Sequence, residues 1–401
     1  MSGGPDAHAA ASQFEFRGKV LGLARHGNGH INDTYLVTCE APDAPVRYIL
    51  QHINRHVFRD PIAVMQNVER VTAHLEQIQS FHAVAGIPQG GFFLGKKPQG
   101  HIRFPYSSSE SAVAAQAAGQ PDGARRALQL VLARDGRNWH VDQEGETWRA
   151  YRFIENARTY ETATSAEQAF QAARAFGRFQ QQLSSLPPPR LHETIPDFHH
   201  TPKRFAALER AITSDAAGRA ALAQPEIEFA RSRQSIASVL VDADLPERIT
   251  HNDTKFNNVL LDDATGEAIC VIDLDTVMPG LVLYDFGDMV RTTTSPAGED
   301  ELDLSKVTMQ FPLFEALVRG YLDSAGAFLT PAERKYLAFS GKLITFETGI
   351  RFLTDYLAGD TYFKVHREGH NLDRCRTQFK LVESIERQEE EMNRLVESVS
   401  R

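Results

Sequence analysis

Cysteine is scarce in this chain of 401 residues, and its spacing excludes two common kinds of stabilising framework. Only Cys39, Cys270 and Cys375 are present; they lie far apart, and none belongs to a Cys-x-x-Cys pair. Disulfide scaffolds and cysteine zinc sites both depend on closely patterned cysteines. We therefore expect neither feature, and we expect the protein to work in a reducing compartment.

Long apolar runs are also missing. No stretch approaches the roughly 18 consecutive apolar residues of a membrane span. The N-terminus reads MSGGPDAHAAAS, without the basic region and apolar stretch of a signal peptide. The sequence therefore predicts a short disordered lead over residues 1–12, a cytoplasmic location and no membrane partner.

An excess of positive charge is absent as well. The chain carries 43 Lys and Arg residues against 52 Asp and Glu residues, which gives a formal net charge of −9. Proteins that bind nucleic acid draw much of their affinity from Lys and Arg side chains that neutralise phosphates, so we expect no nucleic-acid partner. If the substrate is anionic, the balancing positive charge must be local.

Two familiar nucleotide-binding motifs are missing too. No Gly-Lys pair is followed by Ser or Thr, so the chain has no Walker A loop. The run Gly27-Asn28-Gly29 leads to Asn32 and a predicted strand, whereas a dinucleotide-binding turn needs a third glycine and a helix. Any nucleotide must therefore be bound by another kind of loop.

The patterns that are present divide the chain into a β-rich first third and a helical remainder. Apolar and β-branched runs between turn signals predict strands at residues 19–24, 35–39, 46–53, 127–133 and 147–154. Helical periodicity and capping signals predict helices at residues 61–78, after Thr164-x-x-Glu167, after Thr330-Pro331 and at residues 372–399. We expect loops over residues 80–123. The prediction is an α+β protein with an N-lobe over residues 13–154, which would bind the nucleotide, and a larger helical C-lobe over residues 155–401.

The stretch 249–291 carries the chemistry. It reads ITHNDTKFNNVLLDDATGEAICVIDLDTVMPGLVLYDFGDMVR, in which two short apolar runs flank a turn and predict a β-hairpin. Asn258 precedes the outgoing strand and Asp273 follows the returning one, so both lie at the same open end. Asp253 lies five residues before Asn258, in a loop that can fold over that end.

These residue types suit phosphoryl transfer. Two oxygen ligands, Asn258 and Asp273, match the partial protein coordination of Mg²⁺, whose other positions are filled by phosphate oxygens and water. Asp253 could orient and deprotonate a hydroxyl, and the His-x-Asp-x₄-Asn spacing is typical of protein-kinase-like enzymes. Acidic residues also crowd ordinary turns, and we accept that interpretation for Asp262 and Asp263. For His251 we favour a buried structural role.

At these residues the sequence resembles a known family. The segments HNDTKFNN and VIDLDTVMPGLVLYDFGD resemble the aminoglycoside phosphotransferase and choline kinase-like superfamily, and more closely the N-acetylhexosamine 1-kinases. Further similar segments are GHINDTYLV, YILQHIN, WRAYRFIE, ETGIRFLTDYLAGDTYF and HNLDRCRTQFKLVESIE. The resemblance runs from Leu21 to Met392, apart from residues 80–123. It implies a bilobal protein-kinase-like fold that uses ATP and Mg²⁺ to phosphorylate the anomeric C1 hydroxyl of N-acetylglucosamine or N-acetylgalactosamine.

The resemblance also implies roles for individual residues. It makes Asp253 the catalytic base in contact with the sugar, and it makes Asn258 and Asp273 the Mg²⁺ ligands. It assigns the remaining members of the sugar pocket, which are His30, Arg351 and Tyr362. From the residues alone we favour a surface arginine in an ion pair for Arg351 and a core tyrosine for Tyr362, and His30 could equally be a turn residue.

The nucleotide contacts are less well defined. The Gly27-Asn28-Gly29 turn would cover the phosphates, and the adenine would bind backbone groups from Arg152 to Ile154. Protein kinases hold the phosphates with a lysine on the third strand, but here that strand offers only Gln51 and His52. Arg47 and Arg55 are near but poorly phased. Lys255 could meet the transferred phosphoryl group or could be a solvated loop residue.

The sequence therefore predicts an ATP-dependent sugar kinase, with ATP and a small-molecule sugar as its partners. One alternative is a kinase of the same superfamily acting on another sugar, an aminoglycoside, choline or homoserine. A strongly acidic pocket near Arg351 and Tyr362 would favour a cationic acceptor, such as choline or an aminoglycoside. A second alternative is a nucleotide-binding pseudokinase, which the missing lysine favours and the intact Asp253, Asn258 and Asp273 disfavour. The sequence leaves open whether the protein is a monomer or a homodimer.

Overall fold

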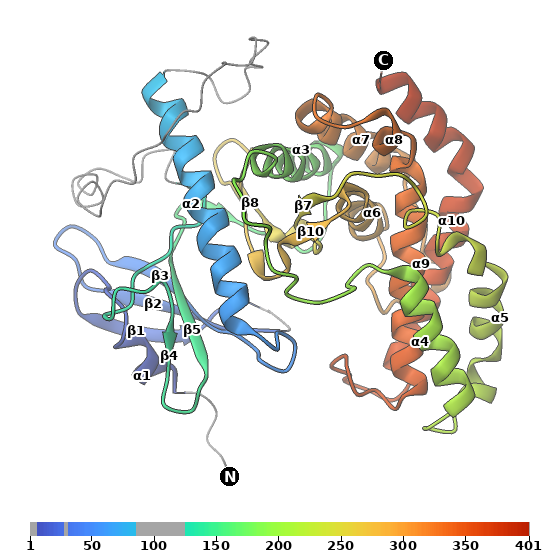
Figure 1. Cartoon of the computed structure of the whole chain (residues 1–401), viewed down its shortest axis with the longest axis horizontal. Coiled ribbons are helices and arrows are strands. Elements are labelled where there is room, and N and C mark those ends of the chain that lie inside the picture. Colours follow the sequence, from blue (N-terminus) through green and yellow to red (C-terminus); the bar gives the residue numbers. More distant parts are fainter. Residues whose placement is uncertain (1–5, 28–30, 86–124, 401) are drawn as a thin grey trace.

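The chain folds into a β-rich N-terminal lobe and a larger helical C-terminal lobe (Figure 1). The structure is a computed structural model that describes residues 6–27, 31–85 and 125–400. The arrangement confirms the predicted α+β class. None of the described helices is both long and apolar enough to cross a membrane. The three cysteines are buried and unpaired, as expected.

The N-terminal lobe is built on a five-stranded sheet in the order β1-β2-β3-β5-β4. Its strands are β1 (Val20–Arg25), β2 (Asp33–Cys39), β3 (Val46–His52), β4 (His140–Val141) and β5 (Thr147–Arg152). Alternate residues of β3 face opposite sides. Tyr48 and Leu50 pack with Trp148 on one side, whereas Ile49 faces helix α2 (Pro61–Ala85) on the other. The second side is the one that looks toward the C-terminal lobe.

The N-terminal segment differs from the expected disordered lead. Residues 7–11 form a short helix, α1 (Ala7–Ala11), whose N-terminus is capped by the side chain of Asp6. Ala7, Ala10 and Ala11 are buried against the outer side of the sheet. The prediction is wrong for this part because small alanine side chains let the helix lie close to the strands. Residues 1–5 lie outside the described structure.

Three other local predictions need correction. Residues 127–133 form only isolated bridges, Phe14 with Ala133 and Leu130 with Tyr151, instead of a strand. Helix α2 continues to Ala85, so the expected loop begins later, and residues 86–123 lie outside the described structure. The cap of α3 (Ala166–Leu183) is Ser165, one residue after the predicted Thr164, because the Ser165 hydroxyl accepts a hydrogen bond from the N–H of Gln168.

The C-terminal lobe is a set of helices packed around two clusters of buried apolar residues. The helices are α3, α4 (Thr201–Ser214), α5 (Gln224–Ser232), α6 (Val282–Thr293), α7 (Phe311–Ala325), α8 (Pro331–Lys335), α9 (Leu337–Leu357) and α10 (His370–Val399). The capping box predicted at Thr330 is confirmed, but it opens only the short α8. Helices α6 and α9 approach closely at Gly287, where a Cβ atom would lie 2.4 Å from the carbonyl oxygen of Ser340.

A small β-structure carries the predicted chemistry between the two lobes (Figure 1). Strands β8 (Val259–Asp262) and β9 (Ala268–Val271) form the expected antiparallel hairpin, which is joined by β6 (Ala157–Arg158). Strands β7 (Arg248–Thr250) and β10 (Met278–Gly280) pair beside it. The loops that follow β7 and β9 therefore meet near the junction of the lobes.

Candidate active site

The hairpin brings Asn258 and Asp273 to the same end, as predicted. Val259 pairs with Val271, and the N–H of Ile272 donates to the carbonyl of Asn258 at 2.9 Å. Asp273 follows directly and has a φ of 61°, in the left-handed region. A non-glycine residue is strained there, and such strain is often found at functional sites.

Asp253 joins this pair through Asn258. The Nδ2 group of Asn258 donates to the backbone carbonyl of Asp253 at 2.8 Å and to its Oδ2 at 3.1 Å. Because the amide nitrogen is occupied in this way, Oδ1 of Asn258 is the atom left to act as an acceptor or a metal ligand. The structure thus groups the three residues that the sequence singled out.

Lys255 controls the charge of Asp253. Its Nζ lies 2.9 Å from Oδ1 of Asp253. Burial by itself would raise the pKa of Asp253, but the charge and hydrogen bond of Lys255 outweigh it, so the pKa lies below its usual value. Asp253 is therefore ionised at neutral pH and suited to accept a hydrogen bond from a hydroxyl.

Asp273 has the opposite character. Asp273 is exposed to solvent and accepts no hydrogen bond within the described residues. Desolvation, helped by the negative charges of Asp275 and Asp253, raises the pKa of Asp273 to about 6. Negative charge is therefore concentrated at this point of the site.

This donor set fits Mg²⁺. The Oδ1 atom of Asn258 and the carboxylate of Asp273 are hard oxygen donors, and two protein ligands plus phosphate oxygens and water are typical of Mg²⁺ in nucleotide sites. A divalent cation would also relieve the repulsion that raises the pKa of Asp273. Among the described residues, no group of three or more His, Cys, Asp or Glu side chains is arranged to hold a metal.

His251 has the structural role that the sequence favoured. It is fully buried, and its Nε2 lies 2.9 Å from the carbonyl of Ile272. Because a carbonyl only accepts, Nε2 carries the proton, and Nδ1 is free to accept the N–H of Asp253 at 3.3 Å. Phe176 and Phe179 pack edge-on against its ring. The imidazole thus ties the Asp253 loop to the residue before Asp273.

Asp285 is a residue that the sequence analysis missed. It lies in α6, is fully buried and accepts hydrogen bonds from the N–H groups of His251 at 2.9 Å and Asn252 at 2.7 Å. The side chain of Gln180 donates a third at 2.6 Å. Asp285 therefore fixes the backbone immediately before Asp253. The available signal was an acidic residue within the otherwise apolar run VLYDF.

On the N-terminal lobe, Gln51 occupies the place where a lysine was sought. It lies between Thr34 and Arg149 in register across β2, β3 and β5. Its Nε2 donates to Oγ1 of Thr34 at 3.1 Å, and its Oε1 accepts from Nε of Arg149 at 3.0 Å. Arg149 also forms an ion pair with Asp275, which lies in the 3₁₀ turn η5 (Leu274–Thr276). The sequence analysis assigned no role to either member of that pair.

The other cations near β3 are occupied by carboxylates. Arg47 pairs with Glu155. His52 and Arg55 both contact Glu146, at 2.9 Å and 3.3 Å. The sequence indicated that Arg47 and Arg55 are poorly placed to hold phosphates beside this strand. In the structure both side chains pair with carboxylates.

The structure describes only some of the residues that are predicted to contact the nucleotide. Gly27 has a φ of 72°, as a tight turn requires, whereas Asn28, Gly29 and His30 lie outside the described residues. The N–H of Arg152 donates to the carbonyl of Gln129 at 2.9 Å, so this one N–H is not available to an adenine, and the contact with backbone groups from Arg152 to Ile154 stays a prediction. Ile154 makes no backbone hydrogen bond within the described structure.

Arg351 is not an ion-paired surface arginine within the described residues, and Tyr362 is not a core tyrosine. Arg351 is half-buried, lies 5.1 Å from the ring of Phe198 and 5.6 Å from that of Phe363, and forms no ion pair or hydrogen bond within the described residues. Tyr362 is 59% exposed. Its backbone N–H donates to Asp355 at 2.8 Å, which orients the loop. Both side chains are therefore available to a ligand.

A buried hydrogen-bonded chain connects this region to Asp253. His199 places Nδ1 2.8 Å from Glu347 and Nε2 3.3 Å from the carbonyl of Asn252, the residue before Asp253. Glu347 precedes Arg351 by one turn of α9, so the two share a helix face. Phe198, which contacts Arg351, is the neighbour of His199. These contacts join the Arg351 region to the Asp253 loop.

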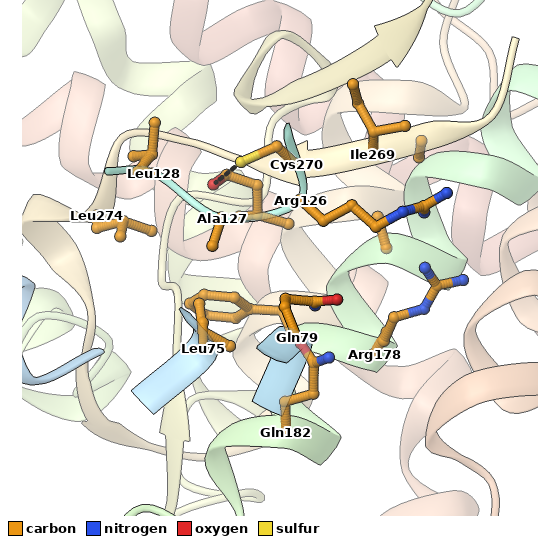
Figure 2. Close-up of a pocket in the computed structure, with 14 residues that line it drawn as sticks. Leu75, Gln79, Arg126, Ala127, Leu128, Arg178, Gln182, Ile269, Cys270 and Leu274 are labelled. Atoms are coloured by element: carbon orange, nitrogen blue, oxygen red, sulfur yellow. Dashed lines mark hydrogen bonds between the residues drawn. The ribbon is translucent and has the colours of Figure 1, made fainter. Parts of the chain in front are cut away.

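A separate pocket is lined by residues of α2, α3 and β9 (Figure 2). Leu75, Phe179 and Leu274 form part of its apolar wall, and the guanidinium groups of Arg126 and Arg178 lie on one side of it. None of the predicted site residues lines this pocket. It is distinct from the cluster around Asp253.

Comparisons with known proteins agree with the fold. A family model described as the phosphotransferase enzyme family matches residues 22–328. A solved aminoglycoside phosphotransferase from Alicyclobacillus acidocaldarius superposes with a TM-score of 0.59 at 11% identity, covering 99% of this chain and 98% of that chain.

Two further solved structures share the fold. A spectinomycin phosphotransferase in complex with ADP and spectinomycin has a TM-score of 0.52 at 12% identity, and 92% of each chain is covered. A microcompartment-associated aminopropanol kinase has a TM-score of 0.51 at 16% identity, covering 96% of this chain and 98% of that chain. At these identities the similarity extends to the fold alone.

Proposed function

The chain belongs to the phosphotransferase enzyme family, and from that premise we propose that it transfers the terminal phosphoryl group of ATP to a hydroxyl of a small molecule. The observation that carries this proposal is the grouping of Asp253, Asn258 and Asp273 at one end of the catalytic hairpin. The same three residues argue against a pseudokinase, because each retains the side chain that its role requires.

In the proposed mechanism Asp253 orients the attacking hydroxyl. Its pKa is lowered by Lys255, so it is a weak base but a good hydrogen-bond acceptor. Such a group is sufficient for phosphoryl transfer, in which little proton removal precedes the loose transition state and positioning is the main contribution. Mg²⁺, held by Asn258 and Asp273, would supply neutralisation of the phosphate charge.

We further propose that the acceptor is a neutral sugar, an N-acetylhexosamine phosphorylated at its C1 hydroxyl. The charge near Arg351 supports a neutral acceptor. Arg204 and Arg351 are close enough for the charge of Arg351 to lower the pKa of Arg204, after the larger effect of burial. A cationic alcohol would be repelled by both groups.

The nearby carboxylates do not reverse this balance, since each is held by the protein. Glu347 bonds His199 and Thr201, and Asp360 pairs with Arg219. Asp355 accepts three backbone N–H groups, those of residues 361–363. What remains exposed is a guanidinium with free donors and the rings of Tyr362 and Phe363. Hydrogen-bond donors and aromatic faces suit the acetamido oxygen and the apolar face of a hexosamine.

The acceptor is tested by a panel of substrates. Purified protein is incubated with ATP and Mg²⁺ and one of N-acetylglucosamine, N-acetylgalactosamine, glucose, galactose, choline, homoserine or an aminoglycoside, and ADP release is followed. We expect acceptor-dependent release with the two N-acetylhexosamines. Release with choline or an aminoglycoside alone would overturn the proposed acceptor, and absence of release with every acceptor would overturn the proposed reaction.

A further inference from the structure

One guanidinium group at the junction of the lobes is incompletely paired. Arg149 is fully buried. Its Nε donates to Gln51 at 3.0 Å and its Nη1 contacts Asp275, but its Nη2 has no hydrogen-bond partner. A buried donor without an acceptor is costly, and native proteins keep few of them. Nη2 of Arg149 therefore calls for an acceptor that the described protein residues do not supply.

The location of Arg149 indicates which kind of ligand could accept a hydrogen bond from its Nη2. Directly opposed residues on antiparallel strands point to the same face, so Arg149 on β5 shares its face with Gln51 on β3. Gln51 stands where protein kinases carry the lysine that holds the nucleotide phosphates. The negative charge of Asp273 also acts on Arg149. Arg149 therefore lies between the third strand and the predicted Mg²⁺ ligand.

We propose that Arg149 is the cation that binds the phosphate chain of ATP, replacing the lysine of the third strand by an arginine of the paired strand. The inference rests on the proposed function, because it deepens the assignment of ATP as the phosphoryl donor. Nη2 is the contacting group, and a phosphate oxygen is the acceptor that completes its hydrogen bonds.

Gln51 and Asp275 act as positioning residues for this arginine. Asp275 is itself held in place, since its Oδ2 accepts from Nδ2 of Asn32 at 2.6 Å and its carbonyl accepts from Thr194 at 2.9 Å. With Nε and Nη1 held, the planar guanidinium has a fixed orientation and presents Nη2 as a directed donor. The arrangement corresponds to the lysine–glutamate pair of protein kinases, with different residues on different elements.

A purely structural role is the alternative. In that case the Arg149–Asp275 pair would only fasten the N-terminal sheet to η5, and losing either residue would have the same effect. The two roles differ in what they predict for ligands of different phosphate content. A phosphate-binding arginine discriminates ATP and ADP from adenosine, whereas a structural tie does not.

The test measures nucleotide affinity directly by calorimetry on the full chain. ATP, ADP and adenosine are titrated into wild type, Arg149→Gln, Arg149→Lys and Asp275→Asn, with folding checked by thermal melts. The control is Arg233→Gln, whose ion pair with Glu386 lies far away in the helical lobe. We expect the control to bind all three ligands as wild type does.

Arg149→Gln should weaken ATP and ADP binding roughly ten- to a hundredfold, the effect of one charge-assisted hydrogen bond, and leave adenosine binding unchanged. Arg149→Lys should recover part of the loss. Asp275→Asn should lower the melting temperature but keep most of the discrimination between ATP and adenosine.

Two results would overturn the role of Arg149: unchanged ATP affinity in folded Arg149→Gln, or an equal loss for ATP and adenosine in both Arg149→Gln and Asp275→Asn. A third outcome is that wild-type protein binds neither ATP nor ADP. That outcome would overturn the proposed function itself, and the role of Arg149 together with it.

Discussion

The proposed catalytic loop and the proposed acceptor region are built in different ways, although buried hydrogen bonds connect them. The loop around Asp253 is fixed by hydrogen bonds that its backbone N–H groups donate to the buried side chains of Asp285 and His251. The acceptor region instead presents Arg351 and Tyr362, which contact aromatic rings and have no side-chain hydrogen-bond partner among the described residues.

This difference separates reaction from specificity. A backbone held by buried polar groups gives one rigid geometry, which suits a reaction shared by a whole family. Partly exposed side chains can change without disturbing the core, which suits the choice of acceptor. Substitutions in the loop should therefore lower turnover for every acceptor, and substitutions near Arg351 should change affinity for the sugar alone.

Replacing Asp253 should have the largest effect. Asp253→Asn keeps the size of the side chain but removes the negative charge that orients the hydroxyl, and we expect kcat to fall about 10³-fold. Nucleotide binding should persist because Asn258 and Asp273 are unchanged. Steady-state kinetics and ATP titrations check both points, and Asp263→Asn in the exposed turn of the hairpin is the matched control. A variant that keeps wild-type kcat would remove Asp253 from the mechanism.

Replacing Asp285 should show that its hydrogen bonds hold the Asp253 loop in place. Asp285→Ala leaves the N–H groups of His251 and Asn252 without an acceptor, which we expect to cost about 3 kcal/mol of unfolding free energy. In protein that remains folded, kcat should fall about tenfold or more, since Asp253 loses its fixed position. Denaturant unfolding and kinetics on the same samples measure these effects. Asp323→Ala, on the surface of α7, should change neither quantity.

Arg351 should affect the acceptor instead of the reaction. Arg351→Met removes the unpaired guanidinium but keeps an apolar side chain between Phe198 and Phe363. We expect KM for the sugar to rise roughly ten- to a hundredfold, with kcat and KM for ATP nearly unchanged. Arg367→Met, which breaks an ion pair between the loop that follows α9 and Asp373 in α10, is the control. A large fall in kcat without a change in KM would contradict the separation of the two regions.

Tyr362 should have the smallest effect. Tyr362→Ala removes a ring that is 59% exposed and packs against Phe363, and we expect KM for the sugar to rise about fivefold. Tyr362→Phe separates the hydroxyl from the ring. If Phe restores wild-type KM, stacking accounts for the contribution; if it does not, the hydroxyl bonds the sugar.

The same contrast explains how far the sequence could predict the site. Asp253, Asn258 and Asp273 were grouped correctly because they lie within one short segment whose hairpin register is set locally. Arg149 was missed because it reaches the site only through the pairing of β5 with β3, which no local pattern reveals. Asp285 was missed although it lies in the same segment, where an acidic residue within an apolar run was its one local signal.

The fold shows a similar division. The two lobes and helices α2, α3, α8 and α10 followed from periodicity and caps, whereas α4 to α7 were not predicted. Helix α1 and the bridges at residues 127–133 depended on contacts with distant strands. Small alanines at Ala7 and Ala10 form a helix here because a sheet surface lies beside them, which the sequence of the segment does not reveal.

The most direct test of the account is the structure of the reaction product. Protein is incubated with ATP, Mg²⁺ and N-acetylglucosamine or N-acetylgalactosamine, and the product is examined by phosphorus–proton NMR. The account predicts one new phosphorus resonance coupled to the anomeric proton, formed together with ADP and absent with Asp253→Asn. A phosphate coupled to another sugar proton would contradict the C1 assignment. Unreacted sugar and intact ATP would contradict the central claim.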